Sequence, residues 1–426
     1  MNRSAYAAAL LFASAAAATA PLRAQAPDPA RLAALYDRHD CFTARDALKT
    51  APPGASAGLA FYRGWVSAAF NQPARAASEL RAYLASPAAR ADEKHRRAAE
   101  QLLADVLVRE FRYGEAADAY ARVAAATADS TREDMANNAT LFAALRAVPA
   151  QTVAFAADVD VPLTRDRAGL MNVAVEAGGV KQDFVFDTGA NLSTVMESVA
   201  RELGFRIIDQ RVSVGTATGA RAQARLAVAP ELRIGRATVR DVVFLVLPDS
   251  AMSFPQIGYR IRGIVGHPVI AGLGEVTLTR DGHLRAAAHA SPVAAGAEPN
   301  LCLDGLDNLV RGEAGGEPLL LGLDTGAART QLFPPYHRRN RAAVEAGQAT
   351  TLRIGGAAGT QTLKAYSIGP VALTVGGATA TLPQVSVSTE PSGARSDYAD
   401  GDVGQDVITH FAEMTLDYRA MQLRFR

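Results

Sequence analysis

One short pattern occurs twice in this sequence, and the duplication constrains the fold more than any other feature. Residues 184–190 read FVFDTGA, and residues 321–327 read LGLDTGA. In each copy an apolar strand ends in Asp-Thr-Gly, which places a carboxylate at the tip of a tight turn where glycine permits close backbone approach. The copies are far enough apart to predict two similar lobes, each contributing one carboxylate.

The chemistry of such a pair depends on both members, Asp187 and Asp324. Two carboxylates held about 3 Å apart cannot both ionise, so they share a proton and together activate water, one as base and one as acid. A single Asp-Thr-Gly is a common turn and carries little weight alone. The paired copies predict a catalytic dyad.

The duplication extends beyond the motif. Glycine landmarks recur in the same order and at a nearly constant spacing: Gly215 with Gly355, Gly235 with Gly376, and Gly266 with Gly404. A loose connector bearing proline and glycine lies near 291–299. We therefore expect a first β lobe over 154–290 and a second over 299–426.

The region 28–148 has a helical, alanine-rich periodicity with few strand signals. The pattern over 63–83 recurs over 103–123, with Ala76 and Ala116 at matching positions. This resembles degenerate tetratricopeptide repeats, although the offset is longer than their usual period of about 34 residues. Repeat-like helical hairpins are expected, and an ordinary helical bundle is the alternative. Such a region could bind a peptide or a partner protein, or cover part of the β region.

Residues 1–26 are typical of a secretory signal peptide, with Arg3 ahead of an alanine-rich apolar stretch. Cleavage after Ala20, Ala24 or Ala26 fits the small residues there, and an uncleaved anchor is the alternative. No other run reaches about 18 apolar residues, the length of a membrane span. The sequence predicts a periplasmic or secreted protein without a stable membrane span after cleavage.

Composition excludes several classes of protein. With 44 basic and 43 acidic residues the formal net charge is +1, which does not suggest nucleic-acid binding. Cys41 and Cys302 are far apart in sequence, and unpaired thiols are expected. No metal or other cofactor is expected. The histidines lack the spacing of metal ligands and favour surface or capping roles: His267, His283, His289 and His410. The aspartates lack the ordered pattern of a calcium loop and favour a solvated turn: Asp397, Asp400, Asp402 and Asp406.

The β region resembles the retropepsin-like aspartic peptidases of bacteria, within the pepsin and retropepsin superfamily. The string FDTGANLSTV at 186–195 carries the resemblance, as does the apolar pair before Gly266. Before Gly404 the pair is Asp402-Val403, which departs from the family pattern. The resemblance covers about 154–426 and implies an all-β, double-lobed acid-protease fold. The whole chain is therefore expected to be a multidomain α and β protein.

The resemblance also implies roles for individual residues. Asp187 and Asp324 would be catalytic, and the dyad would be supported by Thr188, Gly189, Thr325, Gly326, Gly266 and Gly404. Two hairpins match the flaps that close over a substrate, marked by Gly215, Thr216, Gly219, Gly355, Gly356 and Gly359. Retropepsins normally dimerise to join two lobes. Because this chain carries both, a monomer is expected, with a lobe-swapped dimer as a variant.

The expected activity is that of an aspartic endopeptidase acting on a peptide or protein substrate. Ala190 and Ala327 replace hydroxyl residues that pepsins often place there, so a less acidic pH optimum than pepsin's is expected. The alternative is an inactive, peptide-binding scaffold, because Arg329 and Asp402 depart from the pattern in the second lobe. Arg329 is expected to face solvent; if it faced Asp324, it would hold that carboxylate charged.

Overall fold

A computed structural model describes residues 28–50, 57–129, 131–216, 218–255, 258–289, 292, 296–356 and 359–426. The expected signal peptide, 1–26, lies outside the described residues, as does part of the connector near 291–299. No helix in the described part of the chain is long and apolar enough to cross a membrane. The order predicted from the sequence, a helical region followed by a β-rich region, is confirmed.

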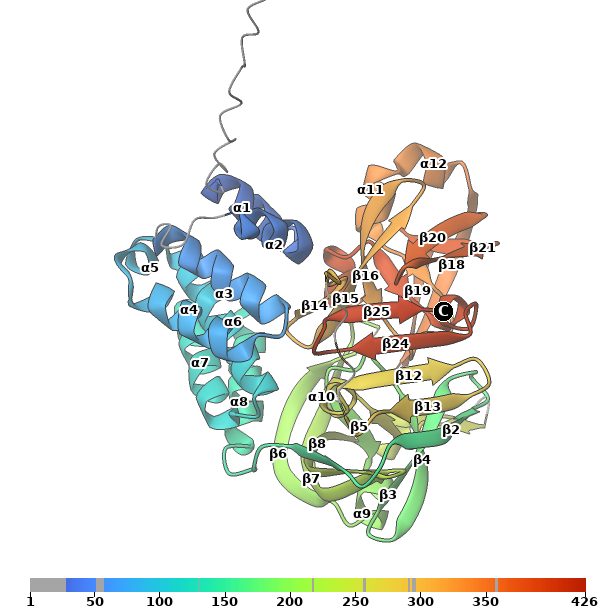
Figure 1. The fold of residues 1–426 in the computed structure, drawn as a ribbon. Helices are drawn as coiled ribbons and strands as arrows, with labels where there is room; N and C mark the ends of the chain where they lie inside the picture. The colour runs from blue at the N-terminus through green and yellow to red at the C-terminus, as the bar shows by residue number, and fades with distance from the viewer. Residues whose placement is uncertain are drawn as a thin grey trace, which may run out of the picture.

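The helical region lies to one side of two β lobes, blue to cyan beside green, yellow, orange and red in Figure 1. Its elements are α1 (Pro29–Asp37), α2 (Cys41–Lys49), η1 (Ala57–Leu59), α3 (Ala60–Ala69), α4 (Pro73–Ala85), α5 (Pro87–Ala91), α6 (Glu93–Arg109), α7 (Tyr113–Ala126) and α8 (Thr131–Ala144).

Two helical hairpins, α3–α4 and α6–α7, turn in the same way at matching positions of the repeated pattern. Asn71 and Phe111 both have left-handed backbone, with φ of 52° and 58°. The next residue in each turn, Gln72 or Arg112, donates its N–H to a helix carbonyl at 2.9 Å. The internal repeat read from the sequence therefore corresponds to a repeated hairpin, and its relation to tetratricopeptide repeats stays a prediction.

The first lobe begins at Thr152, within two residues of the expected start. Its strands are β1 (Thr152–Phe155), β2 (Val159–Arg165), β3 (Met171–Ala177), β4 (Val180–Phe186), β5 (Ser193–Met196), β6 (Arg206–Gly215), β7 (Arg221–Ile234), β8 (Ala237–Leu247), β9 (Ser253–Phe254), β10 (Tyr259–Arg260), β11 (Gly263–Val265), β12 (Glu275–Thr279) and β13 (His283–Ala286). Short helices α9 (Glu197–Glu202), η2 (Asp249–Met252) and α10 (His267–Gly272) connect some of them.

The second lobe repeats this order. Its strands are β14 (Leu301–Asp304), β15 (Asp307–Ala314), β16 (Glu317–Leu323), β17 (Gln331–Leu332), β18 (Gln348–Gly356), β19 (Gly359–Ile368), β20 (Val371–Val375), β21 (Ala378–Leu382), β22 (Val385–Ser388), β23 (Gly401–Val403), β24 (Glu413–Asp417) and β25 (Gln422–Phe425). Its helices are α11 (Pro334–Arg339), α12 (Arg341–Glu345), η4 (Ala394–Asp397) and α13 (Gln405–Ile408).

Each lobe contains the same crossing of three strands beneath its Asp-Thr-Gly loop. In lobe 1, β11 pairs in parallel with β4 and antiparallel with β5. In lobe 2, β23 pairs in parallel with β16 and antiparallel with β17. The pairing fixes the ends of β4 and β16, and so fixes the two loops that follow them.

A sheet shared by the lobes holds them together. β12 of lobe 1 pairs antiparallel with β24, and Thr277 lies opposite Thr415, its counterpart in the second lobe. The two threonine hydroxyls are 2.9 Å apart. Figure 1 shows these strands, with β13 and β25 outside them, between the two lobes.

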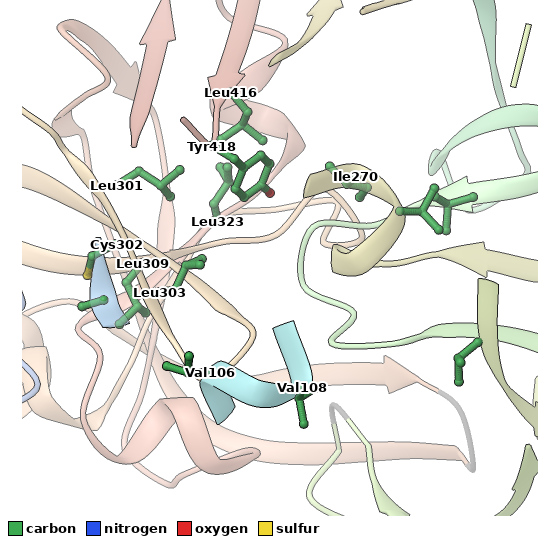
Figure 2. Packing of buried hydrophobic residues seen from close by; sticks show 14 of the residues in the cluster. Val106, Val108, Ile270, Leu301, Cys302, Leu303, Leu309, Leu323, Leu416 and Tyr418 are labelled. Atoms are coloured by element: carbon green, nitrogen blue, oxygen red, sulfur yellow. The ribbon is translucent and has the colours of Figure 1, made fainter. Parts of the chain in front are cut away.

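The helical region packs on the β lobes through a continuous apolar core. Figure 2 shows Val106 of α6 together with Leu303 and Leu309 of the β14–β15 hairpin, which belong to the same buried cluster. Both Val106 and Leu309 are at most 1% exposed. Burial of this kind favours a fixed contact, because roughly 25 cal/mol is gained per Å² of apolar surface removed from water.

The expectation of unpaired thiols is wrong. Cys41 of α2 and Cys302 of β14 form a disulfide, although 261 residues separate them. Sequence separation gave no hint of this, because the docking of α2 on lobe 2 brings the two residues together. Within the described residues, no free cysteine remains.

Candidate active site

The two Asp-Thr-Gly loops meet at the junction of the lobes. Asp187 follows β4 and donates its N–H to the carbonyl of Val265 at 3.0 Å. Asp324 follows β16 and donates in the same way to Val403 at 3.0 Å. The strand crossing under each loop therefore anchors the backbone of each aspartate, and each carboxyl group lies close to the glycine of the opposite loop.

Thr188 and Thr325 lock the two loops together across the lobe boundary. The N–H of each threonine donates to the hydroxyl of the other at 3.0 Å. Each hydroxyl in turn donates to a carbonyl of the opposite lobe, Leu323 at 2.8 Å and Phe186 at 2.6 Å. Both side chains are at most 1% exposed, so these bonds are shielded from water.

Gly189 and Gly326 permit the close approach of the carboxylates. A Cβ at Gly189 would lie 2.7 Å from Cγ of Asp324, and one at Gly326 would lie 2.5 Å from Oδ2 of Asp187. Each glycine N–H also donates to the aspartate of its own loop at 2.8 Å. Neither position has space for a side chain while the carboxylates stay paired.

Gly266 and Gly404 support the loops from below. Each donates its N–H to a hydroxyl of its own lobe, Ser193 at 3.1 Å or Thr330 at 3.0 Å. A Cβ at Gly266 would lie 2.7 Å from the carbonyl oxygen of Ala190, and one at Gly404 would overlap the backbone of residue 329 at 2.5 Å. The backbone can therefore pass here only without a side chain.

Two buried amide side chains that the sequence reasoning missed hold the threonine carbonyls. Asn308 donates to the carbonyl of Thr188, and Gln405 donates to that of Thr325, both at 2.8 Å. Asn308 is fully buried and Gln405 is 4% exposed. Their pairing depends on contacts between strands distant in sequence, so no local signal identifies them.

The electrostatics of the pair favour a shared proton. Burial raises the pKa of Asp187. Burial and the charge of Asp187 raise the pKa of Asp324 to about 7. A carboxylate that loses water and faces a like charge holds its proton to higher pH, so one proton stays on the pair over a broad range.

The first expected flap reaches the second lobe. The β6–β7 hairpin turns through Thr216 and Gly219, whose φ is 71°. The Thr216 hydroxyl donates to the carbonyl of Ala220 at 2.9 Å, which fixes the turn. A Cβ at Gly219 would lie 3.6 Å from the backbone nitrogen of Gly393, which precedes η4.

The second expected flap is a regular hairpin, and its role as a flap stays a prediction. Gly355 pairs with Thr360, and Gly356 pairs with Gly359. A Cβ at Gly355 would meet only Thr360 of the same hairpin, at 3.9 Å, among the described residues. The tip residues 357–358 lie outside the described part of the chain.

The residue that enters the site from lobe 2 is Arg395 of η4, and Arg329 is exposed to solvent as expected. Nη2 of Arg395 lies 3.7 Å from Oδ2 of Asp324. The same guanidinium contacts Asp402 and Asp307 at 2.9 and 3.2 Å. In the sequence, only Asp402 before Gly404 indicated that such a cation exists, because a buried carboxylate requires a partner.

Among the histidines, His267 is buried at 3% exposed, so of the expected surface and capping roles the surface role is wrong for it. Its ring packs edge-on against Tyr418. Burial lowers the pKa of His267 to about 3, which leaves the ring neutral. In the part of the chain that is described, no group of three or more His, Cys, Asp or Glu side chains is arranged to hold a metal ion.

Comparisons with known proteins agree with this geometry for the first lobe. Residues 173–269 match a family model described as aspartyl protease. One similar solved structure is a retropepsin-like aspartic protease from Rickettsia conorii, 18% identical, with a TM-score of 0.22 over 32% of this chain and 94% of that one. A search of curated proteins found no match. The match over 173–269 shows that the first lobe is similar to aspartyl proteases, and a helical region precedes it in the chain.

Proposed function

We propose that the protein is an aspartic endopeptidase that hydrolyses peptide bonds with Asp187 and Asp324. The observation that carries the proposal is the reciprocal lock between Thr188 and Thr325, which holds the two carboxyl groups face to face. Two similar carboxyl groups that share one proton can supply a base and an acid at the same time.

In the proposed reaction, the ionised carboxylate accepts a proton from a bound water, which attacks the peptide carbonyl. The protonated carboxyl donates to the developing oxyanion, so the negative charge is neutralised as it forms. The intermediate then collapses: the C–N bond breaks, the amine leaves with the proton taken from the water, and the hydroxyl that becomes the product carbonyl returns its proton to the other carboxylate, which restores the dyad. The Gly189 and Gly326 N–H groups keep each carboxyl group in position throughout.

The substrate would bind in extended form beneath the β6–β7 hairpin. An extended peptide can add as a strand to exposed main-chain groups, and a closing hairpin excludes water from the reaction. The contact of Gly219 with Gly393 supports this place for the peptide, because the hairpin already spans from one lobe to the other.

The decisive test is cleavage of a broad peptide library by the purified protein, with Asp187→Asn and Asp324→Asn compared separately. Each change keeps the shape of the side chain and removes a carboxyl group, so we expect a loss of about 1000-fold from either, within the range of about 10²–10⁴ that a positioned general acid or base contributes. Arg329→Gln is a matched control in an exposed position. A single variant that retains wild-type activity would contradict the dyad.

The pH profile of the same reaction tests the shared proton. Activity should fall as pH decreases and both carboxyl groups become protonated. It should also fall as pH rises through about 7, because Asp324 then loses the shared proton. A peak below about pH 3, between the two pKa values of the pepsin dyad, would contradict the expected less acidic optimum.

The second candidate is an inactive scaffold that binds peptides between the lobes and partners through the helical region. Arg395 favours it, because a cation 3.7 Å from Asp324 opposes protonation of that carboxyl group. The raised pKa of Asp324 favours the enzyme, because burial and Asp187 outweigh this cation. Peptide binding without cleavage would support the scaffold.

We further propose that the protein works as a monomer in the periplasm or outside the cell. Both Asp-Thr-Gly loops come from one chain, and the Cys41–Cys302 disulfide is typical of an oxidising compartment. Sedimentation at two protein concentrations distinguishes a monomer from a lobe-swapped dimer.

A further inference from the structure

The two lobes differ at one matched position of their central strand pairs. In lobe 1, Val185 of β4 lies opposite Ile264 of β11. In lobe 2, Gly322 of β16 lies opposite Asp402 of β23 in the same register. An apolar pair next to one catalytic loop is thus replaced by a glycine and a buried carboxylate next to the other.

Gly322 makes room for an ion pair. A Cβ at Gly322 would overlap Oδ1 of Asp402 and would lie 2.6 Å from Nε of Arg395. The Arg395 side chain is 13% exposed and that of Asp402 is 6% exposed. The glycine, the aspartate and the arginine therefore occupy together the space that valine and isoleucine fill in lobe 1.

Arg395 is held by two carboxylates and faces a third. Its Nη2 donates to Oδ2 of Asp402 at 3.1 Å, and its Nη1 donates to Oδ1 of Asp307 at 3.2 Å. The position equivalent to Asp307 in lobe 1 is Leu170, so this carboxylate is also specific to lobe 2. Held from both sides, the guanidinium stays 3.7 Å from Oδ2 of Asp324.

We propose that Arg395 is a positioning residue for the dyad: fixed by Asp307 and Asp402, it holds Asp324 in place and favours its charged form, so the pair works at lower pH than it would beside an apolar lobe. The proposal rests on the proposed function, in which the dyad needs one proton. Arg395 acts through Asp324 and has no assigned contact with substrate.

The other charged groups around Asp324 determine how strongly Arg395 acts. Asp187 faces Asp324 from the opposite loop, and the charges of Asp402 on β23 and Asp324 act on each other. Asp307 of β15 contacts Arg395 itself. Asp304 of β14 lies nearby and is paired with His39 at 2.8 Å. Burial raises the pKa of Asp307 to about 6, so below that pH Asp307 becomes neutral and compensates Arg395 less. The arginine therefore acts most strongly in acid.

The test transfers the apolar set of lobe 1 into lobe 2. The triple variant Gly322→Val, Arg395→Leu and Asp402→Ile removes the Arg395–Asp402 pair as a unit. Asp307 loses its arginine partner, but burial raises its pKa to about 6, so it can become neutral and the variant is expected to fold. Arg395→Met removes the cation alone, Arg395→Lys retains it, and Arg329→Met removes an exposed arginine as a matched control. Thermal unfolding of each variant checks the fold.

The readout is the pH dependence of kcat/KM. A cation within about 4–6 Å lowers a carboxyl pKa by about 1–3 units, and the nearby carboxylates offset part of this effect. We therefore expect both limbs of the profile to move about one unit to higher pH in the triple variant and in Arg395→Met. Arg395→Lys and Arg329→Met should stay within a few tenths of a unit of the wild type. A folded triple variant with unchanged limbs would overturn the proposal.

A second readout separates this proposal from the proposed function. Titration of the aspartate carboxyl carbons by NMR, with Asp324→Asn to assign the signal of Asp324, needs no cleavage. If the wild type cleaves no peptide, the proposed function fails, while a higher titration midpoint of Asp324 in Arg395→Met still supports the role of Arg395. An unchanged midpoint in an active enzyme overturns the role of Arg395 alone.

Discussion

At the scale of single residues, the lobe junction depends on two hydroxyl groups. Thr188→Ala removes the donor to Leu323 and the acceptor for the buried N–H of Thr325. An unsatisfied buried group costs about 1–3 kcal/mol, so we expect the melting temperature to fall and the activity to fall with it. Thr188→Ser retains the hydroxyl and should restore most of both.

The matched control for this change is Thr374→Ala. Its hydroxyl also pairs with a threonine, Thr379, at 2.8 Å, but the pair is exposed. Surface substitutions of this kind stay within about 0.5 kcal/mol. Equal losses of melting temperature from Thr188→Ala and Thr374→Ala would show that burial of the lock contributes nothing.

Single residues also mark the limit of what the sequence predicts. Asp187 and Asp324 are identified because a local pattern occurs twice, and a local pattern is visible in a sequence. Arg395 is not, because its importance comes from folding that places it against Asp402. A charged residue at an apolar position indicates that a partner exists, but not which residue it is.

At the scale of elements, α8 holds the edge of the β6–β7 hairpin, the first expected flap. Asn137 donates to the carbonyl of Ser213 on β6 at 2.6 Å and accepts from its N–H at 2.8 Å. Asp134, one turn earlier, forms an ion pair with Arg221 of β7. β6 lies at the edge of its sheet, so α8 satisfies main-chain groups that a neighbouring strand would otherwise pair.

Asn137→Ala should therefore loosen the hairpin without unfolding the protein. A hydrogen bond contributes about 0.5–1.5 kcal/mol, so exchange of the Ser213 amide hydrogen should become roughly threefold to tenfold faster. Asn138→Ala, the same change at the next residue of α8, is the control. Unchanged exchange at Ser213 would mean that α8 does not hold the flap.

The sequence predicts an element well when neighbouring residues carry its pattern, and it does not predict which distant elements pack together. The repeated pattern in the helical region matches two hairpins with the same turn at Asn71 and Phe111. The packing of α8 on β6 could not be predicted, because nothing in either segment identifies the other.

At the scale of the whole molecule, the helical region is attached to both lobes. α8 contacts the β6–β7 hairpin of lobe 1, and α2 is joined to β14 of lobe 2 by Cys41–Cys302. His39 stacks on Tyr398 with ring centres 3.9 Å apart, close to the η4 segment that carries Arg395. The region thus contacts the β6–β7 hairpin and Tyr398, the residue that follows η4.

The disulfide is the strongest of these attachments, and its removal tests them together. The double variant Cys41→Ser and Cys302→Ser removes the link between α2 and lobe 2. A disulfide that closes a long loop stabilises the folded protein by about 2–5 kcal/mol, because it limits the entropy of the unfolded chain. We expect a lower melting temperature, with the dyad still active at moderate temperature because its bonds lie elsewhere. Reductant should lower the melting temperature of the wild type to that of the variant and leave the variant unchanged. Two free thiols in the denatured, unreduced wild type would contradict the disulfide itself.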